Sequence, residues 1–160
     1  MPYLQSLRRR SSISVIARLR SNTLPLNTRC YVRNAEGGHE ECDMCAGGDA
    51  ETPAHFLCVC SAYDAARADM FVAIHSALSN LSTSVVSESA VRELQLWLKR
   101  AVCCDMFDAL IGSDMPDHPH SPTLRVKEVR ELLNRCVATF AVKAWNMRTE
   151  RSTQSPSSAG

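Results

Sequence analysis

The sequence predicts a mainly α-helical protein, in which a helical segment pinned by cysteine and histidine side chains precedes a small helical bundle. Three observations carry this prediction. Only 6 of the 160 residues are glycine, and no alternation of apolar and polar residues runs for long. Apolar residues recur instead at the three- and four-residue spacing of a buried helix face. The hydrophobic fraction of 45% also suffices for a core, which argues against a largely unfolded chain.

The chain begins with a basic lead, residues 1–12, which is followed by a module over residues 13–80. A helix from Ser12 to Arg20 opens this module. It ends before Pro25, because proline disfavours the helical conformation at the residue that precedes it.

Two capping signals predict a break between two further helices of the module. Thr52 is a good N-cap, and the proline after it suits the first position of a short helix. Ser61 is a second N-cap, and Asp64 completes a capping-box-like pair three residues later. A longer helix over 62–81 follows. The first of the two helices therefore ends near Cys60.

The second half of the chain, residues 81–150, is predicted to be a pair of helices that packs on the module. A serine-rich linker over 79–89 leads to a helix over 90–111, and the glycine after it is a natural stop. A proline-rich loop then precedes a last helix over 124–147. The serine-rich tail, residues 151–160, is expected to be disordered.

Charge is distributed unevenly along the chain, although the net charge is only +1. Residues 34–56 carry six acids and neither lysine nor arginine. Residues 1–33 carry no acid and seven arginines, at positions 8, 9, 10, 18, 20, 29 and 33. Such a basic arm predicts a polyanionic partner, with a solvated helix face as the alternative. An arginine- and serine-rich start without acids is also typical of a mitochondrial transit peptide.

Membrane insertion and secretion are not expected. No apolar run approaches the ~18 residues of a bilayer-spanning helix, and the apolar letters near the N-terminus are too broken for a signal peptide. Eight cysteines without a secretion signal indicate a reducing, intracellular compartment, either the nucleus or the cytoplasm. There, clustered cysteines suggest a metal site, and scattered cysteines suggest small core residues.

A cluster of potential metal ligands lies between Cys42 and Cys60. The pattern is Cys-x2-Cys-x9-His-x4-Cys, with Cys45 and His55 as its middle members. Zinc favours four thiolate or imidazole ligands, and a glycine pair between the two halves lets the chain reverse. The sequence therefore predicts one Zn²⁺ ion. Its role would be structural, because four protein ligands leave no open position for catalysis. The alternative is a pair of thiols in an acidic loop with no metal.

The fourth ligand stays open between Cys58 and Cys60. On an unbroken helix Cys58, three residues after His55, shares its face, whereas Cys60 lies about 140° away. The predicted helix break favours Cys60, since it can turn that side chain toward the ion. His39 is a weaker substitute.

The segment around this pattern resembles a known family. The run IARLRSNTLPLN, the Cys-x-x-Cys pair and the run ETPAHFLCVCSAYDAAR are similar to the zinc-binding domain that follows the reverse transcriptase of non-LTR retrotransposons. The resemblance covers roughly residues 13–70 and implies Cys60 as the fourth ligand. One departure lies at residues 21–23, Ser-Asn-Thr, where the family often has Thr-Gly-His. The matching positions are Leu19, Arg20, Pro25, Leu26, Cys42, Cys45, Glu51, Thr52, His55, Phe56, Leu57, Cys60, Tyr63 and Arg67.

The resemblance implies a module detached from the catalytic domains of its relatives. Those relatives carry polymerase and nuclease domains, and this chain has no paired-aspartate polymerase motif. We therefore expect neither enzymatic activity nor a small-molecule substrate. The alternative to a nucleic-acid partner is a zinc-stabilised scaffold for protein–protein interaction. The leading hypothesis is a retroelement-derived module that binds RNA or DNA through phosphate contacts from Arg8, Arg9, Arg10, Arg18, Arg20 and Arg29.

Overall fold

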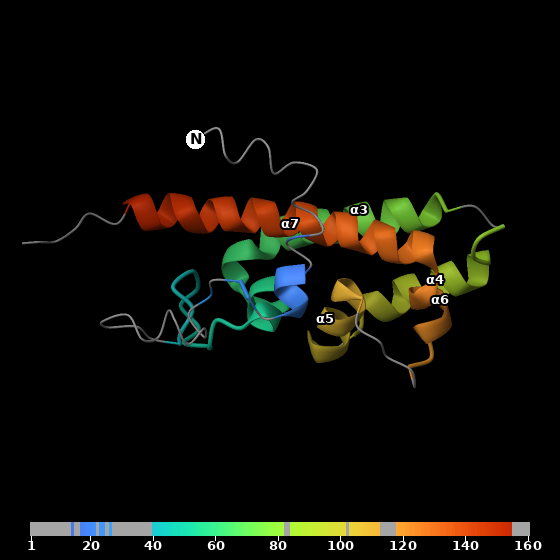
Figure 1. Cartoon of the computed structure of the whole chain (residues 1–160), viewed down its shortest axis with the longest axis horizontal. Helices are drawn as coiled ribbons and strands as arrows, with labels where there is room; N and C mark the ends of the chain where they lie inside the picture. Colours follow the sequence, from blue (N-terminus) through green and yellow to red (C-terminus); the bar gives the residue numbers. More distant parts are fainter. Residues whose placement is uncertain are drawn as a thin grey trace, which may run out of the picture.

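Helix α7 is the element against which α3, α5 and α6 pack. In the computed structural model it runs from Lys127 to Gln154 along the longest axis of the molecule, and α3, Asp64–Ser79, lies beside it (Figure 1). The described residues also include three shorter α-helices, of which α5 and α6 contact α7 while α4 contacts α3 and α6. They are α4, Glu88–Leu98, α5, Cys103–Ile111, and α6, Ser121–Arg125.

The structure describes residues 14, 17–21, 23–24, 26, 40–81, 84–101, 103–112 and 118–154. Over these ranges the chain forms helices and connecting turns and no strand, apart from one isolated antiparallel bridge between Glu41 and Ala50. The predicted mainly α fold class is therefore confirmed. No helix in this part of the chain combines the length and the apolar character that crossing a membrane requires.

The core lies between α3 and α7, and helical spacing predicted its members. Rings from three sequence regions join the core: Phe56, Tyr63 and Phe140 pack edge to face with ring centroids 5.2 to 6.3 Å apart. Burying each large apolar side chain contributes about 1.5–3 kcal/mol. The buried residues of the two helices are Ala66, Met70, Ile74, Leu78, Val129, Leu132, Leu133, Val137, Ala138, Phe140, Ala141 and Ala144.

The N-terminal segment also contributes to the core. Residues 17–20 form a helical turn, and three leucines in and after it are buried, whereas two arginines of the turn are exposed. The leucines anchor the segment and leave the arginines on the surface. The three leucines are Leu19, Leu24 and Leu26, and the two arginines are Arg18 and Arg20.

The prediction of a single helix over 90–111 is wrong, because the structure has two helices, α4 and α5, there. They are separated by a turn in which the Trp97 carbonyl accepts hydrogen bonds from the amides of Arg100 and Ala101, each at 2.8 Å. A straight helix would carry its C-terminal end about 20 Å past the end of α4. The turn instead returns α5 to contact α7, and Leu110 of α5 is fully buried.

The predicted helix over 124–147 is also divided. Val126 is extended, with ψ of 127°, and separates α6 from α7. Helix α7 then continues through residues 151–154, which the sequence predicts to be part of a disordered tail; residues 155–160 lie outside the described part. A tertiary contact stabilises this extension, because Arg151 donates a hydrogen bond to the backbone carbonyl of Met44, 107 positions earlier in the sequence.

The start of α3 differs from its predicted capping. Ser61 opens a short 3₁₀ turn, η3, Ser61–Tyr63, and the helix begins at Asp64 without a side-chain cap. Asp64 accepts a hydrogen bond from Arg67 at 2.5 Å, so the predicted capping box does not form. The predicted break at Cys60 is confirmed, since its ψ of 117° is not helical.

Candidate metal centre

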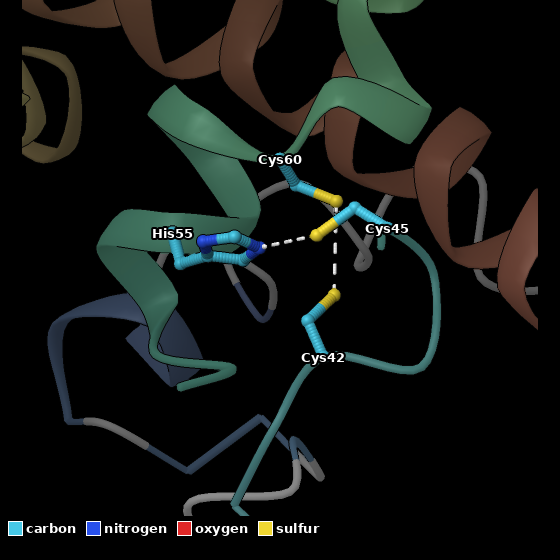
Figure 2. A group of neighbouring side chains, drawn as sticks. All are labelled: Cys42, Cys45, His55 and Cys60. Carbon is cyan, nitrogen blue, oxygen red and sulfur yellow. Dashed lines mark hydrogen bonds between the residues drawn. The ribbon is translucent and has the colours of Figure 1, made fainter. Parts of the chain in front are cut away.

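Three cysteines and one histidine converge beside the start of α3 (Figure 2): Cys42, Cys45, His55 and Cys60. Their four potential ligand atoms all lie within 4.8 Å of one another. The sulfurs of Cys42 and Cys60 are 3.7 Å apart, and the Cys45 sulfur is 3.4 Å from His55 Nε2. Tetrahedral zinc, with bonds of about 2.3 Å to sulfur and about 2.0 Å to nitrogen, would place such pairs about 3.8 Å and about 3.5 Å apart. These two pairs match tetrahedral spacing, and the four residues lie close enough together to hold one metal ion.

The first two ligands belong to a short closed loop, residues 40–51, which we call the metal loop. The Cys42 amide donates to the Asp49 carbonyl at 2.9 Å, and the Glu51 amide donates to the Glu40 carbonyl at 2.7 Å. Gly48 reverses the chain with a φ of 69°, a value that favours glycine. The predicted reversal at the glycine pair is thus observed.

The last two ligands belong to a π-helical turn, η2, His55–Val59, and to the residue after it. Thr52 Oγ1 accepts a hydrogen bond from the His55 amide at 3.0 Å, which confirms Thr52 as an N-cap. The Cys60 amide donates to the His55 carbonyl at 2.8 Å, five residues back, as in a π-helix. Because a π turn winds less per residue than an α turn, five residues bring Cys60 back toward the side of His55.

Cys60 joins the cluster and Cys58 does not. Cys58 is half-buried, and its sulfur is not among the converging atoms. The preference for Cys60 agrees with this geometry, although the decisive feature is the π turn, which no sequence pattern indicated. His39, the weaker substitute, lies outside the described residues.

Neighbouring side chains orient the ligands. Asp49 Oδ2 lies 3.9 Å from Nδ1 of His55, the ring nitrogen that does not face the sulfurs. Carboxylates near this nitrogen commonly set the tautomer of a metal-binding histidine. Arg67 donates from Nε to the Leu57 carbonyl at 3.0 Å and from Nη2 to the Cys60 carbonyl at 2.6 Å. It thereby holds the backbone at the point where the chain leaves the π turn.

A buried ion pair connects the metal loop to the end of α7. Glu51 is 0% exposed, and the Cys42 thiol donates to its carboxylate at 3.8 Å. The guanidinium of Arg148 pairs with this carboxylate. One turn further along α7, Arg151 Nη1 donates to the Met44 carbonyl at 2.8 Å. Two arginines of α7, which are not themselves potential metal ligands, therefore bind the metal loop.

Burial disfavours the charged form of the cysteine sulfurs. It raises the pKa of the Cys60 thiol to about 12, and it raises the pKa of Cys42 as well. Thiolate is the form that attacks electrophiles and binds metals. A metal ion therefore has to displace these protons on binding. The same raised pKa values argue against an activated cysteine nucleophile at this place.

The arginines predicted to contact nucleic acid are only partly described. Arg18 and Arg20 are exposed on the N-terminal turn, and Arg20 Nε donates to the Ile111 carbonyl at the end of α5. The other four lie outside the described residues: Arg8, Arg9, Arg10 and Arg29.

Sequence reasoning missed the part of the centre that α7 contributes. Arg148 and Arg151 lie about ninety or more residues beyond the metal loop, and no local pattern marks them. Their contacts depend on where α7 ends in space. Glu51 did carry a signal, because it directly precedes the capped turn and belongs to the resembling segment.

No family model matches the chain, and no curated protein or solved structure matches it significantly. The resemblance to the retrotransposon module therefore rests on the residues quoted above. Two of these now have a physical role in this chain. Tyr63 packs against Phe56 of the π turn, and Arg67 donates hydrogen bonds to the carbonyls of Leu57 and Cys60.

Proposed function

We propose that this chain is a zinc-stabilised module of retroelement origin that binds RNA or DNA. One observation carries the proposal: three sulfurs and one imidazole converge within 4.8 Å of one another in a segment that resembles the retrotransposon module. Thiolate and imidazole are the ligands that zinc prefers in closed structural sites. With four protein ligands no coordination position stays open, so we infer a structural ion and no polymerase or nuclease activity in this chain.

Metal content tests the first half of the proposal. The purified chain should contain one zinc per molecule, and cobalt(II) substitution should produce the visible absorption of a tetrahedral thiolate site. Cys42→Ser should lose both signals, whereas Cys58→Ala, which alters a half-buried cysteine outside the cluster, should keep them. Absence of zinc from the wild-type chain, or full retention in Cys42→Ser, would contradict the assignment.

Nucleic-acid binding is proposed from the basic N-terminal arm, residues 1–33, which holds seven arginines and no acid. Arginine side chains of such an arm contact the phosphates of the nucleic-acid backbone, and these contacts carry little sequence information. If the six proposed arginines each neutralise one phosphate, the affinity for single-stranded RNA would depend on salt with a log–log slope of about −4. Affinity should then fall about 300-fold between about 50 mM and about 200 mM salt.

Fluorescence anisotropy with labelled single-stranded RNA and DNA measures this dependence directly. Steep weakening of binding with salt supports the proposal. Equally negligible binding at both salt concentrations would exclude it.

A protein–protein scaffold is the second candidate function, and exposed apolar side chains favour it. Val72 on α3 is 70% exposed, Leu96 on α4 is 48% exposed, and Val59 at the end of the π turn is 46% exposed. The metal loop adds an acidic surface. A scaffold gives no reason for affinity toward RNA or DNA at either salt concentration, so the same titration separates the two functions.

A further inference from the structure

We propose that Arg20 and Arg130 together form a phosphate-binding site at Gly112, where the N-terminal turn, the end of α5 and the first turn of α7 meet. The inference rests on the proposed function, since the phosphate belongs to bound RNA or DNA. It assigns a residue of α7 to the nucleic-acid surface, more than a hundred positions after Arg20.

Both arginines lie against the same glycine. A Cβ atom at Gly112 would lie 2.5 Å from Arg20 Nη2 and 3.6 Å from Arg130 Cγ. Gly112 has a φ of 71° and no side chain, so the Arg20 guanidinium can lie directly against the backbone. The hydrogen bond from Arg20 Nε to the Ile111 carbonyl fixes this guanidinium in place. The N–H groups of its two Nη atoms stay available to a further acceptor.

Among the described residues, no acid forms an ion pair with either of the two positive charges. Both arginine side chains are exposed. The neighbouring Lys127, by contrast, pairs with Glu131 at 3.9 Å. Burial lowers the pKa of Arg20, and the charge of Arg130 lowers it further. The fold thus holds two like charges near each other at an electrostatic cost.

A phosphate would relieve this repulsion. Guanidinium groups match phosphate oxygens geometrically and form paired, charge-assisted hydrogen bonds with them. The site is also continuous with the proposed binding arm, because Arg18 is exposed on the same helical turn as Arg20. An RNA or DNA strand that is bound along the basic arm and continues past Arg18 would therefore place a phosphate between Arg20 and Arg130.

Two matched variants test the site. Arg130→Gln and Arg135→Gln each remove one exposed arginine from α7, and neither residue forms an ion pair within the described ranges. Only Arg130 lies at Gly112. With an oligouridine RNA probe, Arg130→Gln should weaken binding about fivefold at about 0.1 M salt and reduce the salt slope by about 0.7, the value for one single-strand phosphate. Arg135→Gln should leave the slope unchanged; equal effects of the two variants would overturn the inference.

A double-mutant cycle tests whether the two arginines share one phosphate. Arg20→Gln and Arg130→Gln should be non-additive, with the combined loss differing from the product of the single losses by more than about twofold. The pair Arg20→Gln and Arg135→Gln should be additive. Additivity in both pairs would rule out a shared site.

Inorganic pyrophosphate separates failure of this inference from failure of the proposed function. If the wild-type chain does not bind RNA, the proposed function fails. The site still predicts that pyrophosphate shifts the amide NMR resonance of Gly112, and that Arg130→Gln abolishes this shift while Arg135→Gln keeps it. No shift in the wild-type chain, or an unchanged shift in Arg130→Gln, would overturn the site itself.

Discussion

Glu51 is a fully buried carboxylate, and Arg148 supplies the positive charge that compensates it. A buried charge is costly unless a partner of opposite charge and good hydrogen bonds accompany it. Arg148 also lies 3.9 Å from Asp43 Oδ2, and its guanidinium carbon is 5.9 Å from the centre of the Trp145 ring. The side chain therefore bridges the metal loop and α7 through charge and stacking contacts.

Arg148→Met should destabilise the zinc-loaded chain by about 3–5 kcal/mol, because Glu51 is left buried without its partner. Urea denaturation would measure this loss. The double variant Glu51→Gln with Arg148→Met should recover a substantial part of it, since no uncompensated charge remains. A single-variant loss below about 1 kcal/mol would mean that the pair is not a significant stabilising contact.

Cys60→Ala should lose the metal, and Cys58→Ala should retain it. The Cys60 sulfur is 3.7 Å from that of Cys42, whereas the Cys58 sulfur lies outside the converging group. Zinc stoichiometry by elemental analysis distinguishes the two variants. The opposite pattern would show that the turn after His55 has a different geometry when the ion is bound.

His120 makes stability sensitive to acid. Its ring centroid is 5.5 Å from that of Trp97, and burial lowers its pKa, with a further decrease from His118 and an opposing effect of Glu93. A histidine whose folded-state pKa is depressed takes up its proton mainly in the unfolded state. The contribution of His120 to the free energy of unfolding is therefore present above its unfolded-state pKa of about 6.5 and is lost as pH falls below that value.

The variant His120→Gln should flatten this loss of stability between about pH 7 and about pH 5. The relevant quantity is the difference in unfolding free energy between wild type and variant at each pH. Both proteins carry the same metal centre, so its own sensitivity to acid cancels in that difference. A difference that does not change with pH would contradict the assignment.

Turns between helices determine where the elements of this fold can meet. The turn after Trp97 divides a continuous helical pattern and returns α5 to the body of the molecule. Helix α5 ends at Ile111, and Gly112 directly after it has a φ of 71°. The Arg20 side chain occupies the space that a side chain on Gly112 would need. The glycine thereby allows the N-terminal turn and α5 to approach closely.

Gly112→Ala and Gly48→Ala should differ in cost, although both residues have a positive φ. The left-handed conformation alone costs alanine about 1 kcal/mol in each case. A Cβ on Gly48 meets nothing within 4 Å, whereas one on Gly112 displaces the Arg20 guanidinium and its bond to Ile111. Gly112→Ala should therefore lose about 1 kcal/mol more. Thermal denaturation measures both variants, and equal losses would contradict the close approach.

At the scale of the whole molecule, α7 links the metal centre to the helical core. One part of α7 packs along α3 over residues that are fully buried, and its end contacts the metal loop through Arg148 and Arg151. Metal binding and docking of the end of α7 should therefore stabilise each other, because both need the same loop conformation.

Removing the metal with a chelator should loosen two separated segments together. Amide hydrogen exchange should accelerate in residues 42–60 and in the last turns of α7, while the central part of α3 stays protected by its core contacts with α7. Arg151→Gln in the zinc-loaded chain should accelerate exchange most strongly at the end of α7, and to a smaller degree in the metal loop that Arg151 contacts. If chelation left the end of α7 unchanged, the two regions would not be coupled.

The sequence by itself determined the helical class, the helical spacing of the buried residues of α3 and α7, and three residues of the candidate metal centre, Cys42, Cys45 and His55. These features depend on local periodicity and on the spacing of a few ligands, which a single chain segment already contains. The cap at Thr52 and the break at Cys60 were likewise local, and both are observed.

The tertiary structure alone decided the remaining features. It divided the pattern over 90–111, because burial of α5 against α7 outweighs the local preference for one continuous helix. It extended α7 through Gln154, because Arg148 and Arg151 find partners on the metal loop. It brought Cys60 rather than Cys58 to the cluster through a π turn. The division of 90–111 and the extension of α7 depend on contacts between residues far apart in the chain, which no local pattern encodes, whereas the π turn is held by hydrogen bonds within the segment 52–67.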